Sequence, residues 1–315
     1  MRKIANAMRK PYNAIDGIRC VLICLVVLVH IVNFGRLHPD VKEAVNFFFM
    51  PAFLLVTGYL VNFRVGAGAF CLYLLRIALP YVVMSVGFAV MSLWVPVEGG
   101  LGVFSWSGLA DVLLVHPIGP YWFLHAMLVC GVVCYVSISI ARPAGVGGAL
   151  CLMACLLAAV SWTTPLAFVY VTFYFLGVAL RLCGADFLKF FAPSPWAALP
   201  FGAIFLFCYP SGGGLSVAGL SVCFFCFVAW VWGRLGGRAA RVVGYVGRNT
   251  LPIYLFHPLF TLVAKFALPL FDFDATGVVH AIFTVSFAVA GSLAIAWAFD
   301  RTGACRLFAR GALLR

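Results

Sequence analysis

The stretch Asp16-Gly-Ile-Arg-Cys-Val-Leu-Ile-Cys-Leu-Val-Val-Leu-Val-His30 places an arginine and a histidine on either side of an unbroken apolar run. On a helix that turns about 100° per residue, the step from Arg19 to His30 falls within roughly 20° of three full turns, so both side chains share one face. A rise of about 1.5 Å per residue separates them by roughly 16 Å along the axis. Ionisable groups inside such a segment are costly, which makes the pair a functional hypothesis. A long ligand with a charged head can contact both.

The composition predicts a polytopic helical membrane protein. Of 315 residues, 65% are hydrophobic and 10% are charged, and the mean hydropathy is +1.11, values far from those of soluble domains. Lipid admits only helices or closed barrels, and the apolar runs lack the alternation of barrel strands. The basic residues behind the net charge of +12 lie in short loops between these runs, so we expect no nucleic-acid partner. Most cysteines lie inside the runs as small hydrophobes, and we expect no metal site.

The apolar runs predict ten membrane-spanning helices, since about 20 apolar residues cross a bilayer. The stretch 107–115 is shorter and carries Asp111, so we expect a re-entrant or interfacial segment there. The first run is not followed by a small-residue cleavage site and is expected to be retained. The predicted spans are 16–35, 44–63, 69–95, 120–141, 146–162, 165–182, 195–210, 215–233, 249–269 and 279–300.

Basic residues divide unequally between the two faces that these spans create. If the N-terminus is cytoplasmic, 18 of the 21 Lys and Arg residues fall on the cytoplasmic side, and only Arg36, Lys42 and Lys265 fall on the other. Cytoplasmic loops carry an excess of Lys and Arg, so this division supports an even number of spans with both termini in the cytoplasm. We therefore expect an all-α bundle of about ten transmembrane helices in the inner or plasma membrane. Its parts are a basic N-terminus (1–15), a transmembrane domain (16–300) and a basic tail (301–315).

His30 and Arg19 each have a chemical and a structural interpretation. A neutral histidine deep in the membrane that faces a polar cavity can act as a general base on a hydroxyl, whereas the alternative is an interhelical hydrogen bond. Arg19 can bind an anion at the cytoplasmic edge, or anchor the topology by snorkelling. Asp16, one turn earlier, is placed to pair with Arg19 and fix its direction. Because no Asp or Glu lies mid-membrane to orient His30, we expect a hydroxyl, a backbone carbonyl or water to do so.

Six segments of the chain, taken in order, resemble acyltransferase family 3 of integral membrane proteins. The first is Asp16-Gly-Ile-Arg19, ten residues and then His30, which is similar to the arginine-x10-histidine signature of that family. The others are Phe49-Met-Pro-Ala-Phe-Leu-Leu-Val-Thr-Gly-Tyr59, Arg76-Ile-Ala-Leu-Pro-Tyr81, Tyr121-Trp-Phe-Leu124, Phe173-Tyr-Phe-Leu-Gly177 and Gly247-Arg-Asn-Thr-Leu-Pro-Ile-Tyr-Leu-Phe-His-Pro258.

The resemblance implies an enzyme that moves an acyl group, usually acetyl from acetyl-coenzyme A, onto a hydroxyl of a sugar or glycoconjugate. It implies no tightly bound cofactor, with acyl-coenzyme A as co-substrate. Under this interpretation His30 is the general base, while Arg19, paired with Asp16, positions the donor. Coenzyme A has an anionic head on a long arm, which suits a cation and a base about 16 Å apart. We expect the transfer to be completed within the membrane domain.

Five further residues in these segments are candidates for binding. Arg76 and Arg248 are expected to hold the donor phosphates, unless they serve only as positive-inside markers. Tyr121 and Trp122 are expected to stack on a sugar ring, although aromatic residues also gather at membrane interfaces. His257 is either a substrate contact or a structural group at the kink made by the proline that follows it, whose missing N–H frees a carbonyl three or four residues back.

A transporter or exporter of a polar small molecule or lipid-linked sugar is the competing interpretation, because ten helices and a buried histidine suit that function too. Against it, the sequence has no mid-membrane carboxylate for ion coupling and no evident internal repeat. A membrane scaffold without catalysis would leave the shared face of Arg19 and His30 unused.

Overall fold

The structure is a computed structural model, and it describes residues 13–94, 99–209 and 212–315. Helices dominate these ranges and no strand occurs in them, which confirms the predicted all-α class. The α-helices are α2 (Ala14–Val29), α3 (Val32–Leu37), α4 (Pro39–Leu60), α5 (Ala67–Met91), α6 (Trp106–Leu114), α7 (Trp122–Ile140), α8 (Gly145–Thr163), α9 (Phe168–Leu182), α10 (Phe187–Phe190), α11 (Ala198–Cys208), α12 (Gly213–Trp232), α13 (Gly237–Arg248), α14 (Thr250–Ala264) and α15 (Val278–Thr302). Short 3-10 turns are η1 (Gly119–Tyr121), η2 (Arg142–Ala144), η3 (Pro195–Ala197), η4 (Lys265–Phe271) and η5 (Ala304–Phe308).

Seven helical segments within the described ranges are long and apolar enough to cross a membrane, so the protein is a polytopic helical membrane protein. They are built on α4, α5, α7, α8, α12, α14 and α15. Two shorter apolar helices, Phe168–Leu182 and Pro195–Cys208, and the 16-residue α2 lie where the remaining three spans are predicted. The count of ten and the cytoplasmic termini stay predictions.

The first predicted span, 16–35, is not one continuous helix. A capping box starts α2, because the Asn13 side chain accepts from the Asp16 amide and the Asp16 carboxylate accepts from the Asn13 amide. The helix ends at Val29, and His30 is its C-cap. The His30 amide donates to the carbonyl of Val27, three residues back, instead of to that of Val26, four residues back. The Val26 carbonyl is therefore left without its usual backbone donor. The short α3 then leads into α4.

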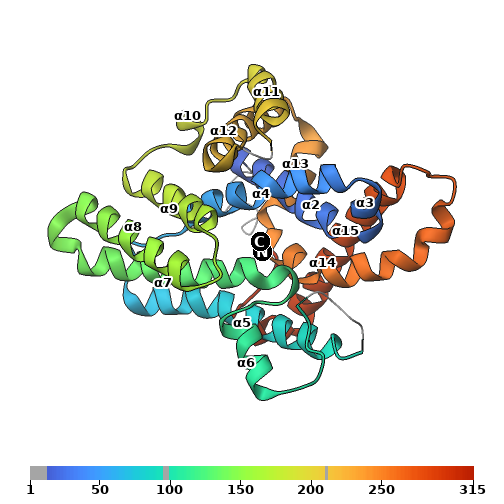
Figure 1. The fold of residues 1–315 in the computed structure, drawn as a ribbon, viewed down its shortest axis with the longest axis horizontal. Coiled ribbons are helices and arrows are strands. Elements are labelled where there is room, and N and C mark those ends of the chain that lie inside the picture. Colours follow the sequence, from blue (N-terminus) through green and yellow to red (C-terminus); the bar gives the residue numbers. More distant parts are fainter. Residues whose placement is uncertain (1–12, 95–98, 210–211) are drawn as a thin grey trace, which may run out of the picture.

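The helix α2 lies at the centre of the bundle, in contact with α4, α12, α13, α14 and α15. Figure 1 shows α7, α8 and α9 on one side of this centre, α11 and α12 on a second, and α5 and α6 on a third. In the apolar stretch of α4, 67% is buried inside the protein, whereas in the apolar stretch of the span that contains α8 only 17% is buried. The helix α4 therefore belongs to the core, and α8 lies at the periphery. Gly177 of α9 lies so close to the Leu55 carbonyl of α4 that a Cβ would overlap it.

The stretch predicted to be re-entrant or interfacial forms the nine-residue helix α6. Ser105 caps it by accepting from the Gly108 amide. Asp111 pairs with His116 at 3.0 Å, and both side chains are half exposed or more. The segment is therefore a short surface helix, too short to cross a bilayer.

Candidate active site

The proline inside α14 creates the setting of His257. Pro258 has no N–H, so the carbonyl of Tyr254, four residues back, loses its helical donor. The Nδ1 atom of His257 lies 2.8 Å from that Tyr254 oxygen and 3.2 Å from the Ile253 oxygen. A carbonyl can only accept, so Nδ1 carries the proton. His257 is fully buried, and its Nε2 has no hydrogen-bond partner among the described residues.

The same local chemistry fixes His30 at the end of α2. Its Nδ1 lies 2.7 Å from the carbonyl oxygen of Val26, one turn back on the same helix. Because that oxygen accepts, Nδ1 carries a proton, and in the neutral form of the ring Nε2 keeps a free lone pair. A backbone carbonyl therefore orients the ring, one of the three possibilities expected from the sequence.

The two imidazoles lie against each other. The ring centroids of His30 and His257 are 5.1 Å apart, and the rings meet edge-on at 69°. His257 also packs against Tyr254, with centroids 5.9 Å apart. His257 therefore stands behind His30, and only His30 of the two lines the adjacent cavity.

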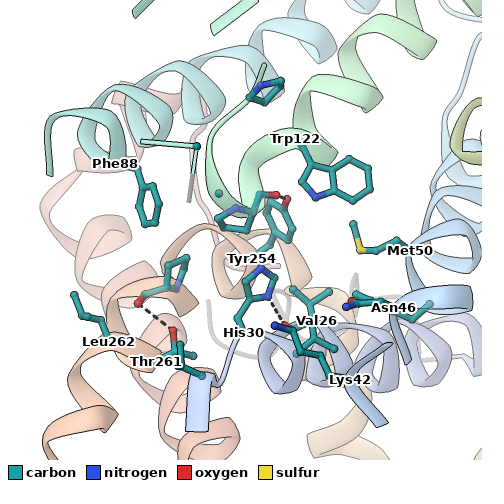
Figure 2. Close-up of a pocket in the computed structure, with 18 of the residues that line it drawn as sticks. Val26, His30, Lys42, Asn46, Met50, Phe88, Trp122, Tyr254, Thr261 and Leu262 are labelled. Carbon is teal, nitrogen blue, oxygen red and sulfur yellow. Dashed lines mark hydrogen bonds between the residues drawn. The ribbon is translucent and has the colours of Figure 1, made fainter. Parts of the chain in front are cut away.

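That cavity has a volume of about 760 Å³, within the range of small-molecule sites. Figure 2 shows His30 on its wall with Val26, Lys42, Asn46, Met50, Trp122 and Tyr254 around it. Trp122 packs on Tyr170 with ring centroids 4.7 Å apart, and both line the cavity. An indole and a phenol on one wall, with a basic nitrogen on another, suit a ligand that has both a ring face and a hydroxyl.

Arg19 lies at the other end of α2 in a separate polar cluster. Its Nη2 donates to the Thr250 hydroxyl at 2.7 Å, and its Nη1 lies 3.9 Å from Asp16. The pairing that the i, i+3 spacing predicts is thus present. Asp16 also accepts from Arg248 Nη2 at 3.0 Å. One buried carboxylate joins two guanidinium groups from α2 and α13 and holds them in fixed directions.

The backbone of α13 approaches α2 closely enough to make this cluster possible. A Cβ on Gly247 would overlap the main-chain carbonyl oxygen of Asp16. Only glycine therefore lets Arg248, the next residue, reach the Asp16 carboxylate.

The tail after α15 adds two more arginines to the same end of the molecule. Asn249 holds Arg315 through a 2.7 Å bond from the Arg315 amide to Oδ1, and the Arg315 charge lies close enough to act on Arg19. Arg76 Nε donates to the Ala309 carbonyl at 3.1 Å, and Arg310 Nη2 donates to the Arg76 carbonyl at 3.0 Å. Five arginines (Arg19, Arg76, Arg248, Arg310 and Arg315) thus belong to two linked groups.

Positive charge gathers around Arg310. Burial lowers the pKa of Arg310 to about 10, and the neighbouring charges of Arg315 and Arg76 act in the same direction. A set of cations that repel one another favours an anion. We call the five residues the arginine cluster.

The predicted site residues therefore divide into three groups. His30 and Trp122 line the cavity, and His257 supports His30 from behind. Tyr121 is 1% exposed, and its hydroxyl donates to the Leu255 carbonyl at 3.2 Å, so it joins η1 to α14 away from the lining. The remaining four lie in the arginine cluster or pair with it: Asp16, Arg19, Arg76 and Arg248.

Sequence reasoning did not find several residues that the fold brings to these places. Lys42, Asn46, Tyr170 and Lys265 line the cavity, and Thr250 binds Arg19. One signal was available for the two lysines, because they are two of the three basic residues that the charge division places opposite the cytoplasmic side. The others carry no local signal.

Comparisons with known proteins agree with the motifs. A family model described as an acyltransferase domain matches residues 12–300, nearly the whole chain. Neither the curated proteins nor the solved structures include a match. A match of this extent shows the family, and the chain belongs to acyltransferase family 3.

Proposed function

We propose that this acyltransferase moves an acetyl or similarly short acyl group from acyl-coenzyme A to a hydroxyl of a carbohydrate or glycoconjugate. The observation that carries the proposal is the 2.7 Å contact between His30 Nδ1 and the Val26 carbonyl. It leaves Nε2 as the basic atom of a residue that lines a cavity of ligand size.

In the proposed reaction His30 Nε2 accepts the proton of the acceptor hydroxyl as its oxygen attacks the thioester carbonyl. The carbon–sulfur bond then breaks, and the leaving thiolate takes the proton from His30, so the imidazole returns to its neutral form. Neither step needs a metal or a bound cofactor to balance. Trp122 and Tyr170 provide aromatic faces on which a sugar ring can stack.

The arginine cluster is the proposed site for the phosphates of coenzyme A. Guanidinium groups bind phosphate with paired hydrogen bonds, and these five bring excess positive charge to one end of α2. The predicted topology assigns that end to the cytoplasmic side, where the donor is made. His30 follows Arg19 by eleven residues, roughly 16 Å of helix, which an extended pantetheine arm can span.

The proposed location is the inner or plasma membrane, with the acceptor reaching the cavity from the opposite side. Lys42 and Lys265 line the cavity, and the charge division places both away from the cytoplasm. The acceptor is then a component of the cell envelope or a precursor of one.

The proposal is tested with protein purified in detergent and acetyl-coenzyme A labelled in the acetyl group. Loss of the thioester, release of free coenzyme A thiol and appearance of labelled saccharide should occur together when an envelope glycan fraction is added. Protein in vesicles that takes up saccharide without consuming thioester would instead identify a transporter and refute the acyl transfer.

A further inference from the structure

Two lysines line the cavity of His30, and no described carboxylate lines it with them. Lys42 comes from α4 and Lys265 from the first residue of η4. Neither forms an ion pair with any residue that the structure describes, where the acidic partners of ion pairs are Asp16 and Asp111. Lys42 is only half exposed, and among the described residues no carboxylate pairs with its ammonium.

The described acids of the same face do not line the cavity. The predicted topology places six acids opposite the cytoplasm with the two lysines and Arg36: Asp40, Glu43, Glu98, Asp111, Asp272 and Asp274. Glu98 lies outside the described residues. None of these described acids lines the cavity, whereas two of the three cations do. This side of the protein has more acidic than basic residues, and yet the described charged residues that line its cavity are both lysines.

The contacts of three of these acids explain why they do not neutralise the lysines. Glu43 accepts from the Tyr209 hydroxyl at 3.4 Å, and Asp111 pairs with His116 at 3.0 Å. Asp274 accepts from the Thr276 hydroxyl and the His280 amide. Each carboxylate is engaged away from the cavity.

Lys42 is held in a defined place beside His30. A Cβ on Gly35 of α3 would lie 2.8 Å from Lys42 Cδ and 3.5 Å from its Nζ, so the lysine side chain lies across that glycine. Asn46 follows Lys42 by one helical turn and lines the same cavity. Figure 2 shows Lys42 and Asn46 on the side of the cavity where His30 contacts Val26.

We propose that this cavity binds an anionic saccharide, with Lys42 and Lys265 binding a carboxylate or a phosphate carried by the acceptor. The amide of Asn46 supplies a neutral donor beside Lys42, and Trp122 with Tyr170 supplies the face for the sugar ring. Lys42 holds the charged group close to His30, so the hydroxyl that reacts is a near neighbour of that group. The acylation of this saccharide rests on the proposed function. The binding of the saccharide does not depend on any reaction.

The test compares matched saccharides that differ in one charge. Purified protein is titrated calorimetrically with 4-nitrophenyl β-D-glucuronide and with 4-nitrophenyl β-D-glucoside. In a second arm, glucose 1-phosphate is compared with methyl α-D-glucoside, which separates a phosphate site from a carboxylate site. At low salt we expect the charged member of at least one pair to bind about tenfold more tightly, with the difference shrinking as salt rises.

Variants test whether the preference for the charged saccharide depends on Lys42. Lys42→Gln should remove most of the difference in affinity between the charged and the neutral saccharide of a pair, and Lys42→Arg should keep that difference. Gly35→Ala should reduce it while every charge remains, because the new Cβ displaces the Lys42 side chain. Arg36→Gln is the matched control: it removes an exposed cation of the same face that is not part of the lining, and the difference should be unchanged.

Binding of the saccharide and transfer of the acyl group can fail independently. Equal binding of both members of each pair, including no binding of either, overturns the anionic site even if acyl transfer to other acceptors is found. A charge preference that Lys42→Gln abolishes, in a protein that consumes no thioester with any acceptor, supports the anionic site and overturns the proposed acyl transfer.

Discussion

The imidazole of His30 rests edge-on against the imidazole of His257, with ring centroids 5.1 Å apart. Each ring donates from Nδ1 to a backbone carbonyl of its own helix, Val26 in one case and Tyr254 in the other. Two breaks in helical hydrogen bonding, one at the end of α2 and one at Pro258 of α14, thus orient a pair of histidines that lie far apart in the sequence. His30 faces the cavity and His257 fills the space behind it.

We expect His257 to position His30 through this ring contact. His257→Ala should lower kcat about tenfold or more with little change in the donor KM, because His30 loses the ring that fixes its orientation. His257→Phe keeps an aromatic ring and should recover most of kcat. Steady-state kinetics of both variants check this, and equal losses of kcat in the two would exclude the ring contact as the cause.

His30 should be indispensable for transfer and dispensable for folding. His30→Ala should reduce kcat by about 10²- to 10⁴-fold, the usual contribution of a general base, with an unchanged gel-filtration profile. His125→Ala is the control, because His125 bonds the Leu114 carbonyl and lies outside the lining. A well-folded His30→Ala protein that acylates at the wild-type rate refutes the assignment.

Thr250 should act on donor binding through Arg19. Thr250→Val removes the hydroxyl that accepts from Arg19 at 2.7 Å, so the guanidinium loses one of its two anchors. We expect the donor KM to rise several-fold, roughly 1 kcal/mol, with a smaller effect on kcat. Arg19→Ala should raise it further. Thr163→Val removes an exposed hydroxyl that bonds only its own helix and should change neither constant.

Gly247 should be intolerant of any side chain. Gly247→Ala forces a Cβ onto the Asp16 carbonyl oxygen, so α13 must move away from α2 and the bond between Arg248 and Asp16 breaks. The thermal midpoint should fall, and the donor KM should rise. Gly214→Ala, where a Cβ meets nothing within 4 Å, should leave both unchanged or raise the midpoint slightly.

The start of α15 should loosen in acid. Desolvation acts to raise the pKa of Asp274, but hydrogen bonds from the His280 amide, the Thr276 hydroxyl and the Val279 and Gly277 amides outweigh it and lower that pKa below its usual value. A depressed carboxyl pKa stabilises the fold above the unfolded value, and this contribution is lost as pH falls through the folded one. Below about pH 4 the amides of the first α15 turn should therefore exchange faster, after correction for intrinsic rates. Asp274→Asn should abolish that pH dependence.

Some of the site follows from the sequence because it is local. Asp16 and Arg19 are one turn apart, so their pairing needs only a helix. Pro258 frees a carbonyl wherever it occurs in a helix, and His257 is its immediate neighbour. The end of α2 at Val29 could not be predicted in this way, since neither proline nor glycine interrupts the apolar run there.

The sequence by itself determined the helical membrane class, since apolar length and composition suffice for it, and it determined the family through motifs spread along the chain. It also singled out Arg19 and His30 as a pair on one face. Only the tertiary structure decided what surrounds each of them. Thr250, His257 and Lys42 reach them from other helices, in the case of Thr250 across 231 residues of chain. Such contacts depend on which helix faces pack together, and this is set by the whole core rather than by any local pattern.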